Sequence, residues 1–109
     1  MNIRINSKNY VVPQLGFKHM TKMEDMGFSV PDLFQKQKVF SIATAFVGVV
    51  ADCGRDYAEN LIEQHIFGGG KIEDIYKAFN EAVEQSGFFK KLLGQEEEKE
   101  TAKKISEMK

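Results

Sequence analysis

The sequence predicts an α+β fold that is mostly α, with an N-terminal β-hairpin packed on a small bundle of about four to five helices. Two patterns carry this prediction. Apolar and polar residues alternate over the first dozen positions, and apolar residues recur at helical spacing over most of the remainder. The 109 residues, 42% of them hydrophobic, are enough for one domain with its own core.

The hairpin is expected over about 2–6 and 9–13. Ile3 and Ile5 alternate with polar residues in the first strand, the second strand repeats the pattern, and the residues between them favour turns. Pro13 cannot donate to a sheet, so it suits the end of a strand or a sheet edge. Because a two-stranded sheet is marginal alone, this hairpin must lie on helices.

A short first helix is expected near 16–26, where apolar residues take helical spacing from Phe17 and Gly27 supplies a left-handed stop. A second helix begins soon afterwards. Ser29 is placed to cap it, and Pro31 falls in its first turn, where the missing N–H does no harm.

The segment 39–51 is apolar nearly all round, which is typical of a helix in the middle of a core. Its β-branched residues make a buried strand the alternative. Its length and its alanines favour the helix, because 13 residues exceed most strands. The apolar run is also shorter than the roughly 20 residues that cross a bilayer.

Two further helices are expected, over 56–67 and from Ile72 to a stop at Gly87, separated by a run of glycines. Asp56 has the spacing of an N-cap for the first. One face of that helix carries its larger apolar residues and a histidine, namely Tyr57, Leu61, Ile62, His65 and Ile66. The second has the clearest helical period of the chain.

The domain is expected to comprise residues 1–94, followed by a charged tail over 95–109. Only Ile105 and Met108 are large apolar residues in that tail. A segment of this composition buries too little surface to order itself, so disorder is the prediction.

Composition argues against several classes of protein. Fifteen Lys and Arg face 16 Asp and Glu, so no net charge draws the chain to nucleic acid or to an anionic membrane. One cysteine cannot form an internal disulfide, and the N-terminus has no secretory signal pattern. The expected compartment is a reducing cytoplasm.

The run Gly68-Gly69-Gly70-Lys71 before a helix invites comparison with a phosphate-binding loop. The comparison fails, because Ile72 stands where Ser or Thr is required, His65 occupies the upstream glycine position, and a helix precedes the run instead of a strand. A linker between two helices is the interpretation that we retain.

Metal sites fail similar tests. Asp52, Asp56 and Glu63 have the spacing of three calcium ligands, but Gly54 and Tyr57 occupy positions that need an oxygen ligand and a glycine. Zinc would need paired ligands, whereas the cysteine and both histidines are isolated: Cys53, His19 and His65. We therefore predict no catalytic, cofactor or metal residues, and no enzyme.

A surplus of soft apolar residues near helix ends remains. Flexible thioethers and exposed aromatic rings suit surfaces that adapt to partners, although filling gaps in a core is the commoner use of methionine. Both interpretations stay open. The candidate partner-binding residues are Met20, Met23, Met26, Phe88 and Phe89.

One cluster combines basic and aromatic residues. Lys90 and Lys91 directly follow Phe88 and Phe89, whereas the other basic residues are dispersed. This cluster supports an alternative function, a small regulatory nucleic-acid-binding protein, although the balanced charge of the chain argues against nucleic acid as a partner.

The order of features resembles the tail assembly chaperones of long, non-contractile-tailed phages that infect Gram-positive bacteria. The resemblance covers about residues 2–94. It rests on the hairpin with Asn6-Ser7-Lys8-Asn9-Tyr10, a helix that ends in Met26-Gly27, an apolar helix, a glycine-rich break, and the ending Glu81-Ala82 to Ser86-Gly87-Phe88-Phe89. Ser7 departs from the glycine expected in such a turn.

The resemblance implies a non-enzymatic protein of the host cytoplasm that is absent from the mature virion. Its implied partners are the tape-measure protein, which it keeps soluble, and the tail-tube protein, which it helps to recruit. Self-association is a further expectation, because two strands leave both outer edges unpaired. The resemblance also implies a longer product of ribosomal frameshifting, for which an A-rich codon run at Lys103-Lys104 is the candidate site.

Overall fold

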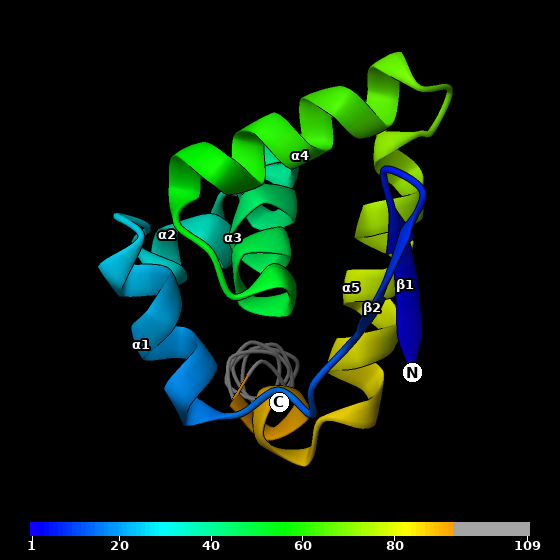
Figure 1. The fold of residues 1–109 in the computed structure, drawn as a ribbon. Coiled ribbons are helices and arrows are strands. Elements are labelled where there is room, and N and C mark those ends of the chain that lie inside the picture. Colours follow the sequence, from blue (N-terminus) through cyan, green and yellow to red (C-terminus); the bar gives the residue numbers. More distant parts are fainter. Residues whose placement is uncertain (93–109) are drawn as a thin grey trace, which may run out of the picture.

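A hairpin and six helices make up residues 1–92, the part of the chain that the computed structural model describes (Figure 1). The mostly helical α+β class is confirmed, with one helix more than expected. Residues 93 and 94 and the predicted tail over 95–109 lie outside the described residues. The elements are β1 (Asn2–Ile5), β2 (Lys8–Val11), α1 (Phe17–Asp25), α2 (Val30–Gln35), α3 (Val39–Ala51), α4 (Arg55–Phe67), α5 (Ile72–Gln85) and a final short helix over 87–92.

Helix α3 is the centre of the core. It contacts α1, α2, α4, α5 and β2, and its residues from Ile42 to Val49 are buried. Figure 1 shows α4 crossing above α3, with α1 and α2 on one side and α5 with the hairpin on the other. Being surrounded on all sides is the reason why this sequence is apolar nearly all round, and the helix is confirmed over the strand alternative.

The hairpin is tighter than predicted. Asn6 and Ser7 alone form the turn, both with positive φ (50° and 66°), which is the type I′ geometry that matches the twist of the strands. Ile3 and Ile5 face the core, at 6% and 0% exposure. Strand β1 contacts α4 and α5, and β2 contacts α3, so the hairpin lies against the helices as expected.

Two details of α4 differ from the prediction. The N-cap is Gly54, and Asp56 lies within the first turn, where it still faces the positive end of the helix dipole. The buried face is formed by Ala58, Leu61 and Ile62, whereas Tyr57 is 59% exposed. At about 100° per residue, Tyr57 and Ile66 stand on opposite sides of this narrow face, so both reach solvent.

The predicted stop at Gly87 is wrong. Helix α5 ends at Gln85, Ser86 is extended, and Gly87 begins the final helix. The Ser86 hydroxyl accepts a hydrogen bond from the Phe89 N–H at 3.0 Å, and its carbonyl accepts one from the Lys90 N–H. Serine therefore caps a new helix here, in the way that such residues begin helices.

No helix within residues 1–92 combines the length and the apolar character needed to cross a membrane.

Candidate functional site

The structure separates the five candidate partner-binding residues into two groups. Met23, Met26 and Phe89 are core residues, at 1%, 8% and 0% exposure, so a partner at the surface does not reach them. Met20 is half-buried and Phe88 is 39% exposed. The commoner use of methionine, filling a core gap, thus accounts for two of the three.

Close packing explains the burial of Met26. Its thioether lies against Gly48 of α3, where a β-carbon would collide with the sulfur and the terminal methyl group. The bend from α1 towards α2 passes through Gly27 at φ 96°, a conformation that favours glycine. These two glycines bring the end of α1 onto the central helix.

Phe88 meets Phe17 at the surface. Their rings pack edge to face, with centroids 6.0 Å apart and an interplanar angle of 90°. Phe17 is 66% exposed and lies one turn before Met20 on α1. We call these three residues, Phe17, Met20 and Phe88, the Phe17–Phe88 patch.

Phe17 was not among the predicted site residues. Its spacing to Met20 places it on the same helical face, but in the sequence it served only to mark the start of the first helix. Because Phe17 begins α1 beside the final helix, its neighbour across the chain comes from residues about 70 positions away. Such a contact carries no local sequence signal.

Three lysines lie close to the patch residues in the sequence. Lys18 follows Phe17, and Lys90 and Lys91 follow Phe88 within two and three positions; all three side chains are exposed. None of them forms an ion pair with another residue of the range 1–92. The basic and aromatic cluster predicted at 88–91 is thus divided, with Phe89 inside the core and the lysines at the surface.

The start of α1 is held by a histidine. His19 Nδ1 accepts a hydrogen bond from the Gly16 N–H at 2.9 Å, and the side chain is buried. Burial lowers the pKa of His19, and the neighbouring Lys18 ammonium lowers it further. His19 therefore acts as a neutral cap that fixes the entry into α1.

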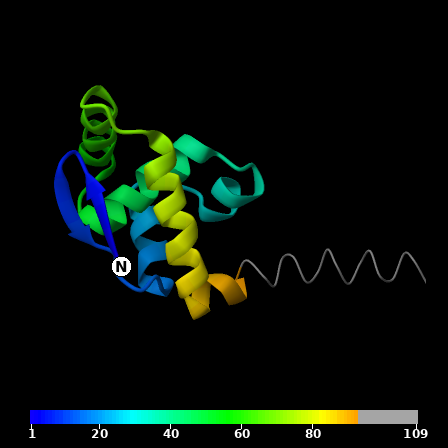
Figure 2. The ribbon, with the colours of Figure 1, turned by 90° about the vertical axis from the view of Figure 1, so that its right-hand side faces the viewer.

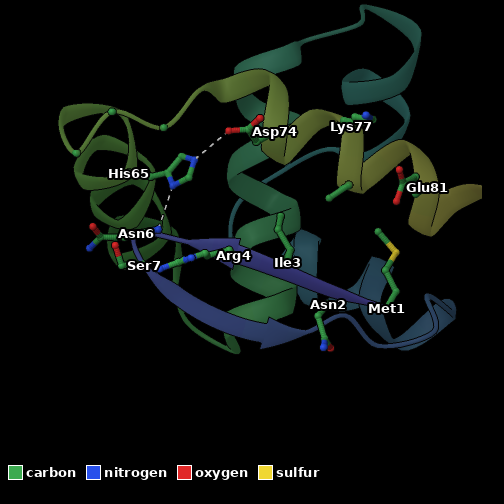
Figure 3. A pocket seen from close by; sticks show the side chains of 14 residues that line it. Met1, Asn2, Ile3, Arg4, Asn6, Ser7, His65, Asp74, Lys77 and Glu81 are labelled. Atoms are coloured by element: carbon green, nitrogen blue, oxygen red, sulfur yellow. Dashed lines mark hydrogen bonds and ion pairs between the residues drawn. The ribbon is translucent and has the colours of Figure 1, made fainter.

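A second surface feature is a hollow of about 590 Å³ between β1 and α5 (Figure 3). It is lined by β1, the hairpin turn and the glycine linker. Residues of α5 that lie one helical turn apart line its opposite side. We call it the β1–α5 groove. The residues of that α5 wall are Asp74, Lys77, Ala78 and Glu81.

His65 closes one end of the β1–α5 groove. Its Nδ1 accepts the Asn6 N–H at 3.0 Å, and the Asn6 amide donates to Gln64 Oε1 at 2.9 Å. Its Nε2 is buried without a hydrogen-bond partner, 3.7 Å from Asp74 Oδ2. A β-carbon at Gly70 would collide with the imidazole ring. The glycine linker is therefore shaped around this histidine.

The candidate zinc and calcium residues do not assemble into a site. Within residues 1–92, no three His, Cys, Asp or Glu side chains come close enough to share a metal ion. Cys53 is half-buried after α3, and burial raises the pKa of its thiol. A raised pKa leaves the thiol protonated, the less reactive form.

Comparisons with protein families, with curated proteins and with solved structures found no match for this chain.

Proposed function

We propose that this protein is a non-enzymatic phage tail assembly chaperone that binds the tape-measure protein in the host cytoplasm, keeps it soluble, and helps recruit tail-tube subunits without entering the mature virion. One observation carries the proposal at the level of residues. The Phe17–Phe88 patch exposes two packed aromatic rings and a flexible thioether on a rigid base.

The base of the patch is what makes it suited to binding. Phe89 is fully buried directly behind Phe88, with its ring 5.9 Å from that of Phe88 and 6.4 Å from that of Phe34. A partner therefore meets rings that are already ordered, so little side-chain entropy is lost on binding. Large aromatic side chains on such a base are the residues that dominate interfaces.

The chemistry of the patch fits a helical client. An amphipathic helix presents an apolar stripe at i, i+3 and i+7, which can cover Phe17, Met20 and Phe88. Lys91 lies one helical turn after Phe88 and is exposed, so it can attract acidic residues beside the stripe. The tape-measure protein, as a long helical protein, offers such stripes repeatedly.

Co-expression with the tape-measure protein of the same phage or prophage tests this proposal. We expect this chain to raise the soluble fraction of the tape-measure protein and to co-purify with it. The double variant Phe17→Ser with Phe88→Ser should lose both effects. The matched control is Tyr57→Ser with Phe67→Ser, which removes two rings of 59% and 82% exposure from α4.

Two outcomes would count against the proposal. If the tape-measure protein stays insoluble and does not co-purify with the wild-type chain, the proposed function is wrong. If the control variant loses solubilisation and co-purification equally, the Phe17–Phe88 patch is not the specific binding site.

The exposed lysines favour one alternative function, that of a small regulatory nucleic-acid-binding protein. It predicts a salt-dependent shift of DNA or RNA mobility that weakens in Lys90→Glu with Lys91→Glu. The chaperone proposal predicts no such shift at physiological salt.

A further inference from the structure

His65 joins the hairpin turn to α5 (Figure 3). Its side chain lies at the end of α4 and is only 10% exposed, and its two ring nitrogens face different elements. Nδ1 accepts the N–H of Asn6, in the hairpin turn, at 3.0 Å. Nε2 faces the carboxylate of Asp74 on α5. The ring is therefore the point at which the turn, α4 and α5 meet.

The hydrogen bond from Asn6 determines where the neutral ring carries its proton. A backbone N–H can only donate, so Nδ1 must present a lone pair. The ring that fits this structure is thus the neutral tautomer with its proton on Nε2. A ring protonated on both nitrogens would set two N–H groups against each other, and the hydrogen bond from Asn6 would be lost.

Nε2 has the opposite requirement. It is buried without a hydrogen-bond partner, because Asp74 Oδ2 lies 3.7 Å away, beyond hydrogen-bonding distance. Gly70 lies directly against this side of the ring, and the Lys71 N–H holds Asp74 Oδ2 at 3.2 Å. The neutral ring leaves a buried donor unpaired here, whereas a positive ring would draw the carboxylate into a charge-assisted hydrogen bond. Each protonation state therefore satisfies one ring nitrogen and not the other.

Charged groups from each neighbouring element bear on this balance. Of the carboxylates within residues 1–92, only that of Asp74 forms an ion pair with the ring. The residues one helical turn away on α4 are uncharged. The other charged groups that line the groove lie on β1, on α5 and at the N-terminus, and they belong to Arg4, Lys77, Glu81 and Met1. The attraction for a positive ring at closest range thus comes from Asp74.

We propose that His65 is a pH-sensitive switch for the hairpin turn: its neutral ring holds Asn6, and its protonation by mild acid exchanges this bond for the ion pair with Asp74 and releases the turn. Histidine suits this role because its charge ordinarily changes between about pH 5 and pH 8. The proton comes from solvent and is carried on Nδ1, and no covalent bond between heavy atoms changes.

The release is confined to the turn. Ile5, directly before Asn6, is fully buried and keeps its strand on the helices. The second bond of the turn, from the Asn6 amide to Gln64, is exposed, so water can replace it. This inference does not depend on the proposed chaperone function or on the Phe17–Phe88 patch.

Nuclear magnetic resonance of the full chain between about pH 8 and pH 5 tests the switch without altering the protein. Nitrogen shifts of the ring report its charge and tautomer, and hydrogen exchange reports the protection of the Asn6 N–H relative to an unstructured chain at the same pH. We expect the proton of the neutral ring on Nε2. As the ring becomes charged, Asn6 should lose protection about five- to tenfold. The Val12 N–H, bonded to the Met1 carbonyl at the other end of the hairpin, is the control and should keep its protection.

Three variants separate the switch from other effects of acid. His65→Asn places an oxygen where Nδ1 was and does not titrate, so the protection of Asn6 should become independent of pH. Asp74→Asn keeps an oxygen for the Lys71 N–H and removes the charge, so the release of Asn6 should move to lower pH. His19→Gln removes the other histidine and should leave the response of Asn6 unchanged.

The proposal is overturned if the neutral ring carries its proton on Nδ1, or if the Asn6 N–H stays protected when the ring is charged. It is also overturned if Asn6 and Val12 lose protection together, because the whole hairpin then opens, or if His65→Asn keeps the pH response. Phe17→Ser with Phe88→Ser should leave the switch intact, so its failure and that of the proposed function can be told apart.

Discussion

The two ends of the described chain are attached to the helices in different ways. Residues 86–92 are held by buried contacts: the Ser86 hydroxyl donates to the Leu15 carbonyl at 2.6 Å, and Phe89 is fully buried. The hairpin has Ile3 and Ile5 in the core, but its tip is held by exposed hydrogen bonds to α4 and its outer edge is unpaired. Figure 2 shows the hairpin and the 87–92 helix on different sides of the molecule.

The two attachments are expected to contribute differently to the stability of the domain. A buried hydroxyl and a buried ring cannot be lost without leaving an unpaired carbonyl or a cavity, so the C-terminal attachment is expected to govern stability. An exposed hydrogen bond contributes less, because water replaces it when it breaks. The hydrogen bonds at the hairpin tip are therefore expected to contribute less to stability than the C-terminal attachment.

The largest effect is expected for Phe89→Ala. Removing a fully buried ring should lower the free energy of unfolding by about 3–5 kcal/mol. Urea unfolding followed by circular dichroism measures this loss. Phe88→Ala removes the neighbouring, partly exposed ring and should cost clearly less; equal losses would show that the 87–92 helix is not anchored by Phe89.

Ser86→Ala is expected to come next, at about 1–3 kcal/mol, because it leaves the Leu15 carbonyl and the Phe89 N–H without their partner. Ser29→Ala is the matched control, since Ser29 holds an N-cap position and makes no side-chain capping bond. The same urea midpoint for both variants would contradict the role given to Ser86.

Acid should weaken the domain through His19, which accepts the Gly16 N–H at the start of α1. Its folded-state pKa lies below the ordinary value of 6.5, so the unfolded chain binds more protons at mildly acidic pH. The stability from neutral His19 is complete above pH 6.5 and is lost as the pH falls through the lowered pKa.

Unfolding free energies measured between pH 7.5 and pH 5 test this expectation. His19→Gln keeps an oxygen that can accept the Gly16 N–H and removes the titrating imidazole. The free energy of unfolding of this variant should therefore fall less steeply between pH 7.5 and pH 5. A wild-type curve parallel to that of His19→Gln would contradict it.

The smallest effect has the opposite sign. Ser7 is held at φ 66°, where glycine is unstrained, so Ser7→Gly should raise stability by about 0.5–1 kcal/mol. Thermal unfolding of Ser7→Gly against Ser7→Ala measures it, because alanine keeps the strain that glycine relieves. A lower melting temperature for Ser7→Gly would indicate that the turn is not type I′ in solution.

Much of the fold was predictable from local patterns. Segment 39–51 was predicted as a central helix because it is apolar on every side, and α5 was predicted from its period. The errors fall where two local rules compete. Gly87 is the kind of residue that ends a helix, but Ser86 before it caps the start of a new one. The Ser86 hydroxyl donates its hydrogen bond to the Leu15 carbonyl, which lies 71 positions away in the sequence.

The candidate sites were less predictable. The sequence marked soft apolar residues at helix ends, and tertiary packing then buried Met23, Met26 and Phe89 while leaving Phe88 beside Phe17. The β1–α5 groove had no signal beyond an unpaired strand edge, because its far wall is supplied by α5 and its end by His65.

The sequence by itself determined that this chain forms a hairpin on a helical bundle. The patterns that predict strands and helices repeat every two residues and every three to four residues, so they can be recognised within short segments. Only the tertiary structure decided which soft residues reach solvent and which strand edge stays open. Those outcomes depend on contacts between residues about 60 to 70 positions apart, such as Asn6 with His65 and Phe17 with Phe88, and local pattern carries no information about them.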